Sequence, residues 1–310
     1  MIQKLPLAST APVLIVGSVA YDTIITPAAT QEYILGGSAS YSSIAASYFA
    51  PVQLVGVVGH DFKKGFIDRF EHHGIDLQGL KISEKEKTFF WKGRYHENFN
   101  HRETLVTELN AFESFEPTLP QNYKETAFVM LGTIGPDLQH HVLDQLNGPA
   151  YIIADTIELW IDIKRKELEA LLPRINLFTI DKREAMMITG ETNTIRAGHK
   201  LRAMGPETVI LKKGEHGALL FHESGLFSIP AYPVTEIEDP TGAGDTFAGA
   251  LLGYLAAKGS TDFATLKKAM AYATATASIT IQAFSMDRLN DAATALIEQR
   301  VEELTALTQF

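Results

Sequence analysis

The sequence predicts an α/β fold, a three-layer sandwich in which helices cover both faces of a mainly parallel central sheet. Short apolar runs alternate with longer amphipathic segments, and this alternation is typical of parallel sheets with crossover helices. The apolar runs are nearly continuous in Val, Ile, Leu and Phe, as strands buried on both faces must be. The predicted strands are residues 13–16, 52–58, 128–131, 151–154, 177–180 and 209–211.

Helical spacing marks segments between these strands. Tyr41, Ile44, Ala45 and Tyr48 recur at i, i+3, i+4 and i+7, which predicts a helix after the first strand. A second helical segment, residues 62–73, stops at Gly74, and glycine commonly caps the C-terminus of a helix.

Two segments interrupt the alternation. Residues 88–111 are rich in aromatic residues, threonine and charge, and they predict two antiparallel strands that turn near Glu97 and Asn98. Residues 22–35 form a second strand-like piece. Together they would build a small sheet, a lid, standing off a single domain that covers residues 1–310. Ordinary edge strands of the main sheet are an equally good interpretation of both segments.

Composition restricts the function. The chain has 310 residues, a formal net charge of -10 and no cysteine. The lack of cysteine excludes disulfides and thiolate zinc sites, and it fits a reducing compartment. The negative charge disfavours nucleic acid as a partner, because phosphate backbones are bound by concentrated Lys and Arg. No apolar stretch approaches the roughly 20 residues of a membrane span, so we expect a cytoplasmic protein that binds no membrane.

The stretch 238–247 (EDPTGAGDTF) leads into a predicted helix that starts near Gly242 and ends at Gly259. The apolar stripe of that helix consists of Phe247, Ala250, Leu251, Tyr254 and Leu255. Gly242 and Gly244 leave the first turn without side chains, so an anion can reach free backbone N–H groups at the positive helix end.

Asp245 projects from the same turn. A carboxylate repels a phosphate bound beside it, and its presence makes sense if it takes the proton from a hydroxyl that attacks the terminal phosphate. The alternative is that Asp245 complements the helix dipole and that the glycines serve close packing. The complete Asp-x-Thr-Gly-Ala-Gly-Asp string favours the functional interpretation. Neither a Gly-x-Gly-x-x-Gly fingerprint after the first strand nor a Walker motif occurs in the sequence.

The string from residue 239 to 245 resembles the C-terminal signature of the ribokinase-like (PfkB) carbohydrate kinase family. Segments 17–22, 36–39, 181–190 and 212–217 resemble further motifs of that family, in the same order. The resemblance covers nearly the whole chain. It implies an α/β sandwich with a small β-lid and ATP-dependent phosphorylation of a small molecule.

The resemblance also implies a role for particular residues. Asp245 would be the catalytic base. The phosphate-binding anion hole would consist of Thr241, Gly242, Ala243 and Gly244. ATP would be bound by Asp181, Lys212, Gly214 and Gly217, and Mg²⁺ by Glu184. The acceptor would be bound by Asp22, Gly36, Gly37, Ser38 and Tyr41.

Simpler interpretations stay open for several of these residues. Asp22 would also suit a turn after a strand, Glu184 a helix start, and Lys212 the exposed end of a strand. Trp91 and Tyr95 share one face of a regular strand. They would either cover the substrate or pack the core of the lid, and lid packing is the favoured interpretation.

Three positions depart from the family pattern. Tyr41 stands where an asparagine is usual and cannot offer the paired donor and acceptor of an amide to vicinal hydroxyls. Asp181 replaces an asparagine and adds negative charge near Mg²⁺. The late loop 282–286 contains no glycine, so the monovalent cation (K⁺) site found in many relatives is in doubt here.

We therefore expect a kinase that uses ATP and Mg²⁺ to phosphorylate a hydroxyl of a ribose- or hexose-type sugar. A nucleoside kinase and a catalytically silent sensor of sugars or nucleotides are the alternatives. A homodimer formed through the lid is a further expectation.

Overall fold

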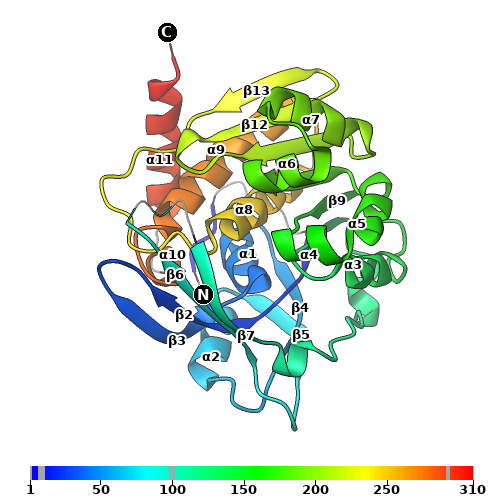
Figure 1. Ribbon diagram of the computed structural model, residues 1–310, viewed down its shortest axis with the longest axis vertical. Helices are drawn as coiled ribbons and strands as arrows, with labels where there is room; N and C mark the ends of the chain where they lie inside the picture. The colour runs from blue at the N-terminus through cyan, green and yellow to red at the C-terminus, as the bar shows by residue number, and fades with distance from the viewer. Residues whose placement is uncertain (1, 6–10, 98, 100–101, 291–293, 310) are drawn as a thin grey trace.

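The computed structural model describes residues 2–5, 11–97, 99, 102–290 and 294–309. One sheet runs through the middle of the molecule (Figure 1). Its strands lie in the order β13 (Gly225–Ile229), β12 (Ala218–His222), β11 (Thr208–Lys212), β10 (Leu177–Asp181), β9 (Tyr151–Ala154), β8 (Phe128–Leu131), β1 (Val13–Val16), β4 (Val52–Val58) and β5 (Ile75–Ile82). The strands from β11 to β5 are parallel to one another, and β12 pairs antiparallel with both β11 and β13. The predicted fold class is therefore confirmed.

Helices cover both faces of this sheet. One face carries α1 (Ser38–Ser47), α2 (Lys64–His72), α8 (Ala243–Lys258), α9 (Phe263–Thr280), α10 (Asp287–Asn290) and α11 (Thr294–Leu307). The other carries α3 (Pro136–Leu143), α4 (Glu158–Ile163), α5 (Arg165–Leu171), α6 (Lys182–Thr189) and α7 (Thr194–Ala203). Short 3-10 helices lie at Asn110–Phe112, Gln121–Tyr123, Leu172–Arg174 and Gly214–His216. Alternate residues of β1 serve the two apolar layers, Val13 and Ile15 the first, Leu14 and Val16 the second.

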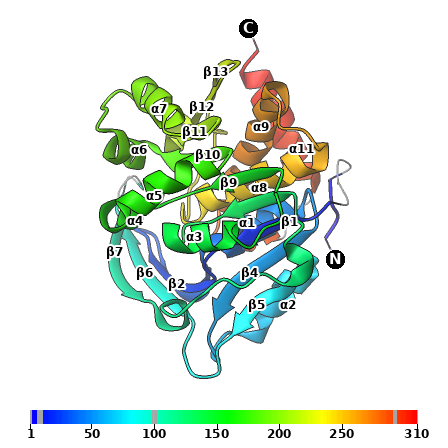
Figure 2. The same ribbon diagram turned by 90° about the vertical axis from the view of Figure 1, so that its right-hand side faces the viewer.

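A second, four-stranded sheet has the order β3 (Thr30–Gly36), β2 (Ala20–Ile25), β6 (Phe89–Tyr95) and β7 (Arg102–Glu108). It lies at the end of the molecule opposite α7 and β13 (Figures 1 and 2). The segments that interrupt the α/β alternation therefore build one separate small sheet. Residues 88–111 contain the expected antiparallel pair, and residues 22–35 belong to a hairpin. Of the predicted turn, Asn98 lies outside the described residues.

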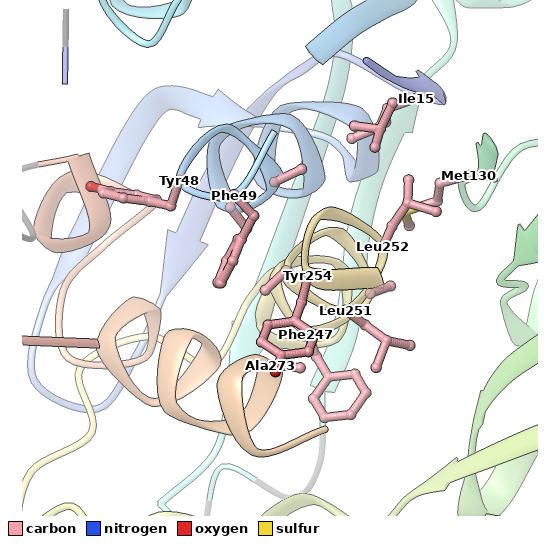
Figure 3. Close-up of a cluster of buried hydrophobic side chains, with 14 of the residues drawn as sticks. Ile15, Tyr48, Phe49, Met130, Phe247, Leu251, Leu252, Tyr254 and Ala273 are labelled. Carbon is pink, nitrogen blue, oxygen red and sulfur yellow. The ribbon is translucent and has the colours of Figure 1, made fainter. Parts of the chain in front are cut away.

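Helix α8 begins after Gly242 and ends at Gly259, as predicted, and both glycines adopt left-handed backbone angles. The expectation of a single apolar stripe was wrong, because every residue from 246 to 256 is buried. The helix is enclosed between α1 and α9 (Figure 3). A Cβ on Gly249 would lie 2.2 Å from the carbonyl oxygen of Ser42, so glycine permits the close approach of α1. None of the helices in the described part of the chain has the length and apolar character needed to cross a membrane.

Candidate active site

The start of α8 is an open backbone turn. Gly242 takes a φ of 74°, and no side chain among the described residues caps the helix. Asp239 is fully buried and fixes the segment that leads into this turn. One of its carboxylate oxygens accepts from the Thr241 N–H at 2.9 Å, and the other accepts from the Ser285 N–H at 3.3 Å. The first N–H groups of a helix have no partners within the helix, so this turn can bind an anion.

Lys212 lies against this turn from the end of β11. A Cβ on Gly244 would be 3.2 Å from the Lys212 ammonium, and the ammonium donates to an Asp155 carboxylate oxygen at 2.6 Å. Burial alone lowers the pKa of Lys212, but Asp155 and then Glu184 favour the charged form and raise it above its ordinary value. Lys212 is therefore a charged, largely buried group at the turn rather than an exposed strand-end lysine.

Asp155 is a site residue that sequence reasoning missed. It follows β9 directly, is buried, and also accepts from the N–H of Thr156 at 2.9 Å. Its place after a buried strand was a usable signal, because ligands of open α/β sheets bind beyond the carboxyl ends of the strands. Asp181 and Lys212 are paired in register at the ends of the neighbouring strands β10 and β11.

Asp245 lies on the first turn of α8 and is partly exposed. Burial, and then the nearby carboxylate of Asp155, raises the pKa of Asp245 to about 7, against the opposing charges of Lys212 and Arg102. A carboxylate that titrates near neutral pH is suited to accept a proton from a hydroxyl.

Asp181 and Glu184 form a capping box at the start of α6. The Asp181 carboxylate accepts from the Glu184 N–H at 2.7 Å, and the Glu184 carboxylate accepts from the Asp181 N–H at 2.9 Å. Burial, followed by the charges of Asp181 and Asp155, raises the pKa of Glu184 to about 8. In the described part of the chain, no group of three or more His, Asp or Glu side chains is arranged to hold a metal ion.

Asp22 lies over the di-glycine turn that precedes α1. A Cβ on Gly36 would be 2.0 Å from an Asp22 carboxylate oxygen, and Gly37 takes a φ of 92° at the start of α1. Asp22 is not a surface turn residue, since it lies buried within β2. Burial and the neighbouring Asp239 and Asp245 raise its pKa to about 8, against the charge of Arg102.

Tyr41 joins the two halves of the site. A Cβ on Gly242 would lie 2.4 Å from the Tyr41 ring, so this glycine does permit close packing. The Tyr41 hydroxyl is buried and has no hydrogen-bond partner among the described residues. Ser38 is bound elsewhere: its N–H donates to the Ser18 hydroxyl at 3.0 Å, and the two hydroxyls are 3.2 Å apart.

The small sheet contacts the turn through Tyr95. The Thr241 hydroxyl donates to the Tyr95 oxygen at 3.1 Å, and Tyr95 packs with Ile24 and Phe284. The favoured interpretation of Tyr95 as a packing residue is therefore confirmed. Arg102, directly opposite Tyr95 on β7, is another residue that sequence reasoning missed.

Gly214 and Gly217 lie in the turn after β11, where both have positive φ angles. A Cβ on Gly217 would be 2.0 Å from the carbonyl oxygen of Ile229, which requires glycine. In the late loop, Ser285 adopts a φ of 56°, so the chain makes this turn without a glycine. Nothing in this turn tests whether a monovalent cation binds there, so the K⁺ site stays a doubtful expectation.

Comparisons with known proteins agree with this geometry. The chain is 30% identical to cytidine kinase from Thermococcus kodakarensis over 77% of its own length and 86% of the relative. It is 25% identical to inositol 3-kinase from Arabidopsis thaliana over 77% and 67% of the two chains. A putative ribokinase II from E. coli in complex with ATP and Mg²⁺ has a TM-score of 0.79, 21% identity, and coverage of 94% and 99%.

The family model described as pfkB family carbohydrate kinase matches residues 11–292. With that match across nearly the whole described chain, the protein belongs to the pfkB family of carbohydrate kinases.

Proposed function

We propose that this kinase transfers the γ-phosphate of MgATP to a hydroxyl of a ribonucleoside. The observation that carries the transfer step is the meeting of three features at one turn: the uncapped start of α8, the ammonium of Lys212, and the carboxylate of Asp245. The turn and Lys212 bind the transferring phosphate, and Asp245 takes the proton of the attacking hydroxyl. A silent sensor would have no need of a carboxylate beside its phosphate site.

The acceptor side supports a molecule with adjacent hydroxyl groups. Asp22 is a buried carboxylate whose raised pKa reflects the cost of holding its charge there, and hydroxyl donors would stabilise that charge. The hydroxyl of Tyr41, which has no partner in the described part of the chain, offers a second polar contact. The ring of Trp91, half-buried on the small sheet next to Asp22 in register, supplies an aromatic surface of the kind on which a base can rest.

Two relatives support an order of preference for the candidate acceptors. The cytidine kinase is the more similar of the two reported relatives, which favours a nucleoside over the sugar that the sequence first suggested. The inositol 3-kinase keeps a sugar or cyclic polyol as the second candidate.

The residues present fit a magnesium ion bound with ATP. Mg²⁺ usually keeps several waters and is held by one or two carboxylates together with substrate phosphates, so no complete protein cage is needed. Asp155 and Glu184 would hold it, and the ion would neutralise phosphate charge. Burial, and then the charges of Asp181 and Asp155, raise the pKa of Glu184, and a cation bound beside it would favour its charged form.

The test is ADP release from MgATP with a panel of matched acceptors: cytidine, 2′-deoxycytidine, uridine, inosine, ribose, fructose and myo-inositol. We expect the ribonucleosides to give the highest kcat/KM and removal of the 2′-hydroxyl to lower it. Higher kcat/KM with ribose, fructose or myo-inositol would transfer the assignment to the second candidate. ADP release that no acceptor raises above background would contradict the kinase proposal and favour a sensor. A lid role for the small sheet, dimerisation through it and a cytoplasmic location stay predictions.

A further inference from the structure

In the small sheet, Arg102 lies on the face that is turned toward the candidate site. Arg102 pairs in register with Tyr95, and residues directly opposite each other in a sheet point to the same face. Tyr95 is buried and bonded to Thr241, so this face is the one turned toward the phosphate-binding turn. Arg94 pairs with Glu103 on the opposite face of the same hairpin, and both are exposed.

Arg102 is exposed, and its side chain rests against an aromatic ring. Its guanidinium carbon lies 5.1 Å from the centre of the Trp91 ring, a cation–π arrangement. Trp91 is itself fixed, because its ring covers Gly93 and its indole N–H donates to the Thr104 hydroxyl at 3.2 Å. A fixed, planar cation matches the geometry of phosphate oxygens better than a mobile lysine does.

The charge of Arg102 acts on both halves of the site. It lowers the pKa of Asp22, the acceptor carboxylate, and that of Asp245, the candidate base, against the larger effect of burial. The register opposite Tyr95, which is bonded to Thr241, points to a guanidinium near the junction where the acceptor hydroxyl would meet the γ-phosphate, and these electrostatic effects agree with it. An uncharged nucleoside offers no anionic partner at this junction, whereas the transferring phosphoryl group does.

We propose that Arg102 is a catalytic residue that binds the phosphoryl group during its transfer, so that the small sheet completes the active site. In this step the acceptor oxygen forms a bond to the γ-phosphorus, the bond from that phosphorus to the β-phosphate oxygen breaks, and the hydroxyl proton passes to Asp245. Negative charge spreads over the equatorial oxygens of the phosphoryl group, and Arg102 stabilises it. This inference rests on the proposed function.

The test compares Arg102→Gln and Arg102→Lys with Arg94→Gln, a matched loss of one arginine on the outer face of the same hairpin. We expect Arg102→Gln to lower kcat about 10²- to 10³-fold, as loss of one transition-state donor does elsewhere. The KM values for MgATP and acceptor should change little. Arg102→Lys should recover part of kcat through its charge, and Arg94→Gln should behave as wild type.

A second measurement separates catalysis from support of Trp91. The groups that act on Asp245 include Asp155, Lys212, Asp22, Tyr41 and Arg102. Removal of the guanidinium takes away a positive charge that lowers the pKa of Asp245, so this pKa should rise in Arg102→Gln. The acid limb of the pH profile of kcat/KM should therefore move to higher pH in Arg102→Gln and stay in place in Arg94→Gln. A purely structural role would lower the melting temperature without moving this limb.

The outcomes separate this inference from the proposed function. Suppose that the wild-type protein turns over. A kcat of Arg102→Gln that falls by less than about tenfold would then overturn the role of Arg102 alone, since loss of a transition-state donor costs more than that. A raised acceptor KM at unchanged kcat in this variant would do the same. An absence of wild-type turnover with every acceptor of the panel would overturn both proposals.

Discussion

The ammonium of Lys212 donates to the carboxylate of Asp155 at 2.6 Å, across the carboxyl ends of β11 and β9. Only 17% of the Lys212 side chain and 3% of the Asp155 side chain are exposed. The ion pair holds a positive charge against Gly244, where the phosphate would bind. It also places a carboxylate where a magnesium ion bound with ATP would be held.

Asp155→Asn should destabilise the protein by about 3–5 kcal/mol, because loss of one partner leaves a buried charge unpaired. The double variant Asp155→Asn/Lys212→Met should regain much of that stability and yet bind MgATP poorly. Chemical denaturation and calorimetric titration measure the two effects. Asp144→Asn, which breaks the exposed pair with Arg174, is the control and should leave the stability nearly unchanged. A double variant as unstable as the single one would contradict this account of the pair.

Stability without nucleotide should fall as the pH rises from 6 to 9. The folded pKa values of Asp22 and Glu184 are raised to about 8, that of Asp245 to about 7 and that of Asp239 to about 6. A carboxyl group with a raised folded pKa binds its proton more tightly in the folded state. Its contribution is therefore complete below the unfolded pKa, near 4, and is lost as the pH passes through the folded value.

Melting temperatures of the nucleotide-free protein between pH 6 and pH 9 check this sign. Asp22→Asn should flatten the curve, since it removes one titrating group and keeps its size. A melting temperature that rises across this range would show that the carboxylates are stabilised in their charged form.

Asp22→Ala should weaken acceptor binding and leave ATP binding nearly unchanged. The carboxylate lies over Gly36 at the end of β3, whereas the phosphate would bind at the α8 turn, where Gly242 packs against the Tyr41 ring. Separate titrations with the acceptor and with MgATP distinguish the two ligands. A large loss of ATP affinity at intact acceptor affinity would place Asp22 in the wrong half of the site.

The small sheet should become more ordered when the acceptor binds. Its contact with the α8 turn is the Thr241–Tyr95 hydrogen bond, and its inner face carries Trp91 and Arg102 toward the site. Hydrogen exchange of residues 88–111 should slow on addition of acceptor, while exchange in β8 serves as the control. Exchange that is the same with and without acceptor would count against a lid.

Sedimentation of the protein tests separately whether two copies associate.

The parallel strands were predictable because strands buried on both faces have nearly continuous apolar sequences. The bounds of β1, β4, β8 and β9 match the predicted ranges, since each runs through the sheet centre with all residues buried. Strand β5 was missed because it lies at the sheet edge, where buried and exposed residues mix. Strands β12 and β13 were also absent from the predicted set.

The ends of α8 were predictable from Gly242 and Gly259, but its full enclosure was not, since that depends on α1 and α9 packing on both sides. In the site, the turn at Gly242–Gly244 and Asp245 follow from a contiguous string. Asp155 and Arg102 come from distant segments that meet Lys212 and Tyr95 only after folding. Single-sequence patterns contain no such pairing.

The turnover number of Asp245→Asn tests the central claim most directly. Asparagine keeps the size of the side chain and fits a first helical turn, but it cannot act as a base. We expect kcat to fall about 10²- to 10⁴-fold, the usual range for a general base. MgATP binding should be intact or slightly tighter, because a charge beside the γ-phosphate is lost. Asp137→Asn, a first-turn aspartate of α3, is the matched control and should keep full activity.

The alternative role of Asp245 makes the opposite prediction. If the residue only complemented the helix dipole, Asp245→Asn would lose about 0.3–1 kcal/mol of stability and little activity. Because burial and Asp155 raise its pKa, we expect a melting temperature at pH 8 that is unchanged or higher. A variant that retains more than about a tenth of wild-type kcat would contradict the assignment of Asp245 as the catalytic base.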